Sequence, residues 1–319
     1  MDKDRNEQEL MSVISYLYYY ADMNQSDIAN RLFLSRSTVS RLLKKARQSG
    51  VVELKINEPW QRDLAMEDQI KTAFNINRVR VLRFEEELDA SAVLDALGKL
   101  VTFYISCNAH NQSVLGLSWG NTISHVVNSI GSSKNIPFTV VPIMGSMTWP
   151  SSNPESLELS YRFSRIYGGR YFPLDAPVHA ATIEQHNALM DTPENAEAIE
   201  VARQADYILT SVGSIRVGSW EKVVGAENIA RLQEIGCVGH IGGHFFDIAG
   251  KEIDGKYKEL HVGLTLEEIR NSDNVICVAA SAEKAEAVYG ALRGELINTL
   301  MITYPLAVRL LEISQSRRL

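Results

Sequence analysis

Short apolar segments alternate with helical segments from residue 61 to the end of the chain, and this alternation constrains the fold more than any other sequence feature. A parallel connection between two strands has to cross a face of the sheet, which usually takes a helix. The alternation therefore predicts an α/β domain with a mainly parallel sheet. The expected strands are 79–82, 114–117, 138–143, 207–210, 275–279 and 300–303. The expected helices are 61–75, 121–130, 194–205, 282–293 and a terminal helix from 305.

The beginning of the chain shows a different pattern, that of three short helices followed by a strand. Asn24 and Ser35 are good N-caps for the second and third helices. Residues 51–56 alternate between apolar and charged side chains, as a strand does. This pattern predicts a winged helix-turn-helix over residues 1–58 and a second domain over residues 59–319. The apolar faces of the three helices lie at 10–17, 28–32 and 39–46.

The net charge of −7 hides a strongly basic segment. Residues 31–55 hold seven Lys and Arg residues and one acid, Glu53, so the segment carries +6 (seven minus one). A short basic segment on an otherwise acidic chain indicates a nucleic-acid-binding module that is attached to a different domain.

The predicted third helix carries the side chains that a helix-turn-helix needs in order to bind DNA. Val39 and Leu42 can dock this helix on the other two, and Phe33-Leu34 form the turn before it. Arginine can bind guanine with two hydrogen bonds, and serine, threonine or lysine can bind bases or phosphates. The alternative is a solvated basic face on a plain helical bundle, and the complete set of docking positions, turn and wing favours DNA binding. The predicted DNA-binding residues are Gln25, Ser35, Arg36, Ser37, Thr38, Ser40, Arg41, Lys44 and Lys45.

Four segments, in this order along the chain, resemble motifs of the SorC family of bacterial sugar-responsive transcriptional regulators. They are QSDIA at 25–29 with STVSRLL at 37–43, LGLSWGNT at 115–122, VGHIGGHFFDIAG at 238–250, and ASAEKAEAVYGALRGELINTL at 280–300. The resemblance implies a winged helix-turn-helix joined to an effector domain that is similar to sugar-phosphate isomerases. It also implies a cytoplasmic homo-oligomer, a dimer or a tetramer, that binds operator DNA. A sugar or sugar phosphate would change the affinity for that DNA in a carbohydrate-utilisation operon.

The segment at 115–122 is the strongest candidate for the effector site. Its glycines allow a tight turn, and successive N–H groups beside a helix N-terminus attract anions. The Gly-Lys-Ser/Thr ending of a Walker A loop is absent, so the segment does not predict ATP hydrolysis. A plain strand-to-helix turn is the alternative, and the resemblance favours ligand binding. Two roles stay open for Trp119, which can stack on a sugar or pack into the core.

Small polar residues follow other predicted strands, and the ligand crevice of an open α/β sheet lies outside the carboxyl ends of its strands. We therefore expect one shared pocket. Lys284 opens the last-but-one helix, where the helix dipole disfavours a cation, and this favours a ligand contact over a plain surface lysine. The predicted effector-binding residues are Gly116, Ser118, Trp119, Gly120, Asn121, Thr122, Gly145, Ser146, Gly213, His240 and Lys284.

Three positions depart from the family pattern. His240 stands where relatives commonly carry Asp, Ala280-Ser281 where Gly-Gly is frequent, and Thr303-Tyr304 where Thr precedes Asp or Asn. These changes indicate a different sugar, a weaker dependence on phosphate, or the loss of a ligand response. His240 and His244 would face one another only on a helix, which Gly242-Gly243 disfavours, so no metal site is predicted.

Two alternatives to this function are an isomerase activity and a second domain without a ligand. A sugar-phosphate isomerase needs a carboxylate base, for which Glu283 is the sole candidate, so no catalytic residue and no enzyme activity are predicted. A second domain that only forms oligomers is the remaining alternative. Three cysteines without a CxxC pair argue against a disulfide framework or a zinc ribbon, and no cofactor is expected. No apolar run reaches transmembrane length, and the charged start does not resemble a secretory signal.

Overall fold

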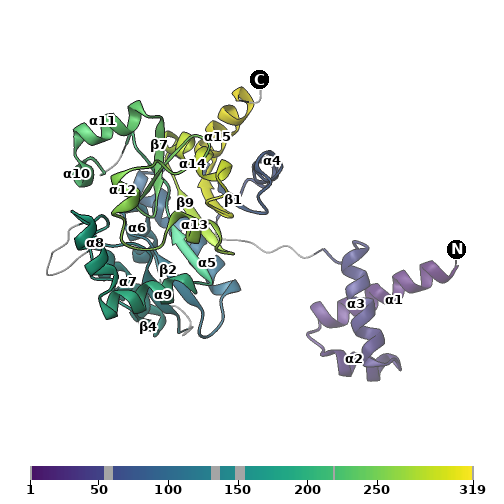
Figure 1. The fold of residues 1–319 in the computed structure, drawn as a ribbon. Coiled ribbons are helices and arrows are strands. Elements are labelled where there is room, and N and C mark those ends of the chain that lie inside the picture. Colours follow the sequence, from purple (N-terminus) through teal and green to yellow (C-terminus); the bar gives the residue numbers. More distant parts are fainter. Residues whose placement is uncertain (1, 54–59, 131–136, 148–154, 218–219, 318–319) are drawn as a thin grey trace. The chain divides into compact units, whose positions relative to one another are not determined.

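The chain forms two compact units, Met1–Pro59 and Trp60–Leu319 (Figure 1). The computed structural model describes residues 2–53, 60–130, 137–147, 155–217 and 220–317. The first unit corresponds to the basic module of the sequence and the second to the α/β domain, and each has its own apolar core.

The first unit consists of α1 (Asp2–Tyr19), α2 (Gln25–Leu32) and α3 (Arg36–Gln48) (Figure 1). The predicted caps are confirmed, because Asn24 Oδ1 accepts hydrogen bonds from the backbone of α2 and Ser35 Oγ accepts one from Thr38 N. The three helices enclose a buried core, which fixes the angle at which α3 presents its polar face. Its fully buried members are Ile14, Ile28, Val39 and Ala46.

The structure describes only the first part of the strand predicted for the wing, and that part does not form a strand. Residues 51–53 form a bend and no strand, and residues 54–56 lie outside the described residues. Val51 and Val52 pack instead against the core of the helical unit, which explains their apolar character.

The described part of the second unit contains a seven-stranded sheet in the order β1-β10-β9-β5-β2-β3-β4. Every neighbouring pair is parallel, which confirms the predicted parallel α/β domain. The strands are β1 (Arg78–Leu82), β2 (Val114–Leu117), β3 (Thr139–Pro142), β4 (Arg170–Tyr171), β5 (Tyr207–Thr210), β9 (Val275–Ala279) and β10 (Thr299–Thr303).

Helices connect these strands and supply most of the remaining core (Figure 1). The longer ones are α4 (Leu64–Phe74), α5 (Ala90–Asn108), α6 (Asn121–Asn128), α7 (Glu155–Tyr167), α8 (Ile183–Met190), α9 (Pro193–Arg203), α11 (Ala226–Glu234), α14 (Ala285–Arg293) and α15 (Tyr304–Ser316). The short ones are α10 (Glu221–Val224), α12 (Lys256–Glu259), α13 (Leu266–Arg270) and the 3₁₀ helix η1 (Ala282–Lys284). Among the described helices, α5 alone has the length and apolar composition of a membrane span, and its Leu97, Val101 and Ile105 are fully buried in the unit's core.

A second, antiparallel sheet was not predicted from the sequence. It pairs β6 (Gly213–Ser214) with β7 (Cys237–Ile241) and β7 with β8 (His244–Asp247). Gly242 and Gly243 form the turn between β7 and β8 with φ values of 54° and 89°. Two positive φ values in succession are typical of a tight hairpin turn and favour glycine at both positions.

The strand order determines where a ligand site can form. From β2 the chain continues to β3 and β4 on one side of the sheet, and from β5 it continues to β9 and β10 on the other. The connections therefore diverge between β2 and β5, and the crevice at such a switch point lies at the carboxyl ends of the two strands.

Candidate functional site

A cavity of about 700 Å³ lies at these carboxyl ends, within the usual size range of small-molecule sites. The segments after β2, β5 and β9 contribute to its walls, together with β7 and the beginning of α5. It brings together the predicted residues Trp119, Gly120, Asn121, Thr122, Gly213, His240 and Lys284. The cavity is also lined by Ser281, one of the small polar residues that follow predicted strands. The remaining lining residues, which were not predicted to bind the effector, are Leu88, Ala90, Val93, Leu94, Ser211, Val217, Trp220, Ala280 and Glu283.

The glycine-rich loop places the N-terminus of α6 at the cavity. Gly116 leaves room for Ile143, because a Cβ atom at position 116 would lie 2.6 Å from Ile143 Cγ2 and would force one of the two residues to shift. Gly120 precedes α6 with a φ of 129° and supplies no side chain to cap the helix. The first N–H groups of α6 therefore have no side-chain cap from the loop, and the positive end of the helix dipole favours an anion there.

Lys284 adds a positive charge beside this helix end. Its Nζ atom lies 3.4 Å from Thr122 Oγ1 and 3.2 Å from Ser211 Oγ, so it joins the segments after β2 and β5. Burial lowers the pKa of the Lys284 ammonium from its usual value. Within the described residues no carboxylate lies within ion-pair distance of it. A lysine in this environment binds an incoming anion more strongly than a fully solvated one.

His240 faces the cavity from β7. A Cβ atom on Gly213, its partner across the antiparallel ladder, would lie 1.9 Å from His240 Nε2, so a larger residue there would displace the imidazole from this position. Its ring centroid lies 4.4 Å from that of Trp220. Burial, and then the charge of Lys284, lower the pKa of His240 to about 3. The ring is therefore neutral at pH 7 and offers a ligand one donor and one acceptor.

Trp119 packs into the core rather than presenting an open face to a sugar. Its Nε1 atom donates a hydrogen bond to Gly145 O at 2.6 Å, and its ring stacks on Trp220 at 5.7 Å. Only 6% of the residue is exposed. Of the two roles that the sequence left open, the structure supports core packing, and the residue also lines the cavity.

Four predicted effector-binding residues do not line the cavity: Gly116, Ser118, Gly145 and Ser146. Ser118 is buried and its backbone N–H donates to Leu209 O. Gly145 has to be glycine because a Cβ atom there would lie 2.3 Å from Pro177 O. Ser146 is buried and bridges to Pro177. Gly145 and Ser146 thus lie where two segments of backbone approach one another closely.

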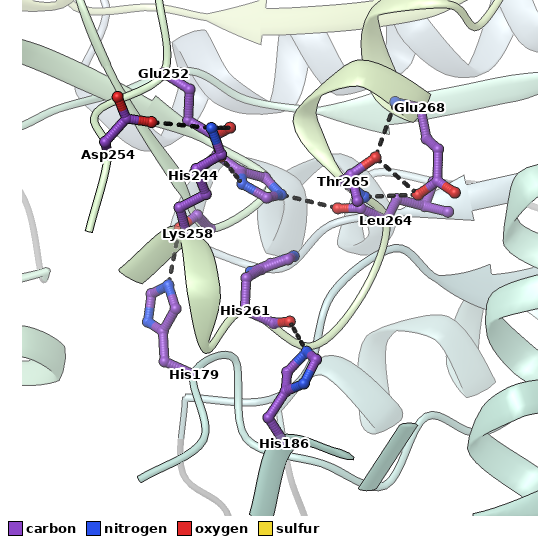
Figure 2. A network of polar contacts seen from close by, with 11 residues as sticks. His179, His186, His244, Glu252, Asp254, Lys258, His261, Leu264, Thr265 and Glu268 are labelled. Atoms are coloured by element: carbon purple, nitrogen blue, oxygen red, sulfur yellow. Dashed lines mark hydrogen bonds and ion pairs between the residues drawn. The ribbon is translucent and has the colours of Figure 1, made fainter. Parts of the chain in front are cut away.

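A cluster of histidines lies in the same unit (Figure 2). His244 is buried, and both of its ring nitrogens face acceptors, Glu252 Oε1 at 2.6 Å and Leu264 O at 2.8 Å. Burial raises the pKa of Glu252, but the hydrogen bonds and charges of His244 and Lys258 outweigh it and lower that pKa overall. His261 packs against His244 with ring centroids 3.9 Å apart and stays neutral, since burial lowers its pKa well below the usual value.

Mild acid should destabilise the protein because several of its histidines are buried in the neutral form. Burial lowers the pKa of His179 to about 4 and that of His240 to about 3, from 6.5. Between pH 6.5 and the lowered pKa values the unfolded chain binds protons that the folded chain does not. The contribution of these two histidines to the free energy of unfolding is therefore complete above pH 6.5 and is lost as pH falls towards 4. Each of the two should account for about 2 kcal/mol between pH 7 and pH 5.

Urea unfolding of the full chain at pH 7 and pH 5 measures this effect. The His179→Gln variant should show a smaller difference between the two pH values than the wild type. Substitution of the exposed His110 by Gln should leave the difference as it is. Equal stability of the wild type at both pH values would contradict the assignment of buried neutral histidines.

The predicted DNA-binding residues divide into two groups in the first unit. Ser35 and Thr38 serve the helix cap, with their hydroxyl oxygens 2.7 Å apart, and Gln25 and Thr38 are half-buried. Lys45 forms an ion pair with Glu7 of α1 at 2.6 Å. The predicted residues that present exposed polar side chains on α3 are Arg36, Ser37, Ser40, Arg41, Lys44 and Lys45. These form one basic face that a DNA duplex can reach.

Comparisons with known proteins find a matching family model for each of the two units. Residues 58–312 match the Sugar-bind family model, which describes a sugar-binding domain, and residues 11–62 match a MarR family model. The sorbitol operon regulator of Klebsiella pneumoniae is 29% identical over 317 residues, which cover 95% of this chain and 98% of that protein. The deoxyribonucleoside regulator of Bacillus subtilis is 26% identical over 304 residues, covering 94% of this chain and 96% of that protein.

The crystal structure of the full-length sorbitol operon regulator SorC from Klebsiella pneumoniae is similar throughout. It aligns with a TM-score of 0.73 at 26% identity, over 95% of this chain and 98% of that chain. The sugar-binding family match includes every strand around the cavity, and the helix-turn-helix match includes α2 and α3. The chain therefore belongs to the SorC family of transcriptional regulators, with an N-terminal DNA-binding helix-turn-helix and a sugar-binding domain.

Proposed function

We propose that this protein regulates a carbohydrate-utilisation operon and that a sugar phosphate or sugar bound in the cavity changes its affinity for operator DNA. The observation that carries the proposal is the pairing of Lys284 with the uncapped N-terminus of α6 in one cavity. Both features favour an anionic group, and phosphate is the anion that helix N-termini commonly bind. Asn121, Ser211 and His240 supply hydrogen bonds for the rest of the ligand.

Residues 1–58 form the DNA-binding domain in this proposal, and residues 59–319 bind the effector and form the oligomer. Arg36 and Arg41 read bases from the start of α3, while Lys44 and Lys45 contact phosphates. One helix-turn-helix reads one half-site, so operator recognition calls for a two-fold assembly, a dimer or a tetramer. Such a regulator acts in the cytoplasm, without a membrane partner.

A sugar-phosphate isomerase is the second candidate. Among the described lining residues, Glu283 is the one carboxylate, and its Oε2 atom lies 3.4 Å from Ser281 Oγ. An isomerase needs a base held against the carbon beside the substrate carbonyl. Glu283 is exposed, which leaves it in solvent rather than held in such a position.

Selection of DNA by the full-length protein tests the proposal. A randomised duplex library should yield an enriched sequence with two related half-sites, and a panel of sugar phosphates and free sugars should contain compounds that raise the melting temperature. If no duplex is enriched at any salt concentration, the proposal fails. Conversion of an aldose or ketose phosphate that is lost in Glu283→Gln would instead support the isomerase.

A further inference from the structure

Phe33 occupies the turn between α2 and α3 in a conformation that disfavours a bulky side chain. Its φ and ψ are 54° and 41°, the left-handed region, and the residue is 96% exposed. A large aromatic residue is uncommon in this region, where glycine is the usual choice after a helix. Phe33 therefore combines backbone strain with the exposure of a whole phenyl ring to water.

The fold of the module does not require this side chain. The turn is made by the backbone, through Leu34 N donating to Ala29 O at 2.9 Å, a bond that glycine at position 33 would equally allow. The neighbouring Leu32 and Leu34 pack against the apolar core of the first unit, and the Phe33 ring lies outside that core. A strained and exposed residue that the fold does not need points to a binding role.

The position of Phe33 identifies its partner. It lies two residues before Ser35, the cap of α3, next to the exposed Arg36 and Ser37. The start of a recognition helix is the part that approaches base edges in the major groove. A phenyl ring forms no strong hydrogen bonds with base edges, and the one apolar group that the base pairs present in that groove is the thymine C5-methyl.

We propose that Phe33 contacts a thymine methyl group at the edge of each half-site and contributes to the sequence specificity of this regulator. The inference rests on the proposed function in one respect, namely that the first unit binds operator DNA through α3. The contact buries the ring that is exposed in the free protein, so its contribution is apolar and independent of salt.

The Phe33→Gly variant separates binding from folding. Glycine relieves the strain, so hydrogen exchange over residues 25–48 of the full chain should be unchanged or slower. Affinity for the duplex selected by the wild type should fall by about 10- to 100-fold, the value of burying one phenylalanine side chain. The slope of log affinity against log salt should stay constant, because no phosphate contact is lost. As a matched control, Tyr20→Ala removes another exposed aromatic side chain of the same unit and should leave the affinity unchanged.

Duplexes in which single thymines are replaced by deoxyuridine test the partner, since this change removes only the methyl group. One position in each half-site should weaken wild-type binding and have no effect on Phe33→Gly. Three results would overturn the inference and leave the proposed function intact. They are a wild-type affinity of Phe33→Gly for the duplex, the absence of any thymine whose replacement weakens the wild type alone, and a changed oligomeric state of the variant. Failure of the wild type to select any duplex would overturn both.

Discussion

Replacement of Lys284 by methionine should abolish the response to a sugar phosphate while leaving the protein folded and able to bind DNA. The ammonium lies within 3.4 Å of Thr122 Oγ1 and 3.2 Å of Ser211 Oγ, at the cavity wall beside α6. Removal of one partner from a charge pair inside a binding site costs about 2–5 kcal/mol, so affinity should fall by at least about 30-fold. A sugar phosphate at 100 times its wild-type dissociation constant stabilises the wild type by about 2.7 kcal/mol and should stabilise the variant far less.

The stability of the unliganded variant distinguishes a ligand-binding role from a structural one. Burial lowers the pKa of Lys284, which means that the folded protein disfavours the charge at this position. Methionine has a similar length and no charge, so the variant should unfold at the same or a higher urea concentration. Lys99→Met, on the exposed side of α5, is the matched control and should leave ligand affinity unchanged. A destabilised Lys284→Met that still binds the ligand would show that the lysine serves the fold instead.

The double variant Arg36→Ala/Arg41→Ala should lose nearly all specific DNA binding. Both side chains are exposed on α3, where the helix presents its polar face. A base-reading arginine contributes about 1–3 kcal/mol, and independent sites add, so the combined loss should be about 2–6 kcal/mol. Filter binding with the selected duplex and with an unrelated duplex measures it, and only the former should weaken strongly.

Lys44→Ala provides the contrast, because a phosphate contact carries no sequence information. This variant should weaken binding to both duplexes alike and reduce the salt slope by about one. Wild-type affinity in the double arginine variant would refute the assignment of α3 as the reading helix, whatever Lys44→Ala does.

Local sequence patterns predicted the parts of the structure that depend on local contacts. The caps at Asn24 and Ser35 are confirmed because N-capping is decided within a few residues of the chain. The loop before α6 could be predicted because a glycine between a strand and a helix allows the backbone to turn tightly, as Gly120 does with its positive φ. The parallel sheet could be predicted from the alternation of strands and helices, because short connections keep consecutive elements close together in space.

The parts that could not be predicted depend on residues far apart in the chain. The pairing of Gly213 with His240 joins two strands of the antiparallel sheet, and no local spacing indicates that the glycine leaves room for the imidazole. Leu88, just before α5, and Leu94, within α5, line the cavity, and the sequence pattern did not predict this helix. Ser118 and Ser146 fit the pattern of small polar residues after strands, yet both are buried in close backbone contacts.

If ligand binding in the cavity controls DNA binding, the affinity of the wild-type protein for its selected duplex depends on whether a sugar phosphate that binds the protein is present. We expect that addition of this ligand changes the affinity by about 5- to 150-fold, the usual range of coupling between sites. The same titration with Lys284→Met should show no change at that ligand concentration. Identical DNA affinities with and without every sugar phosphate that binds the wild type would show that ligand binding does not control DNA binding.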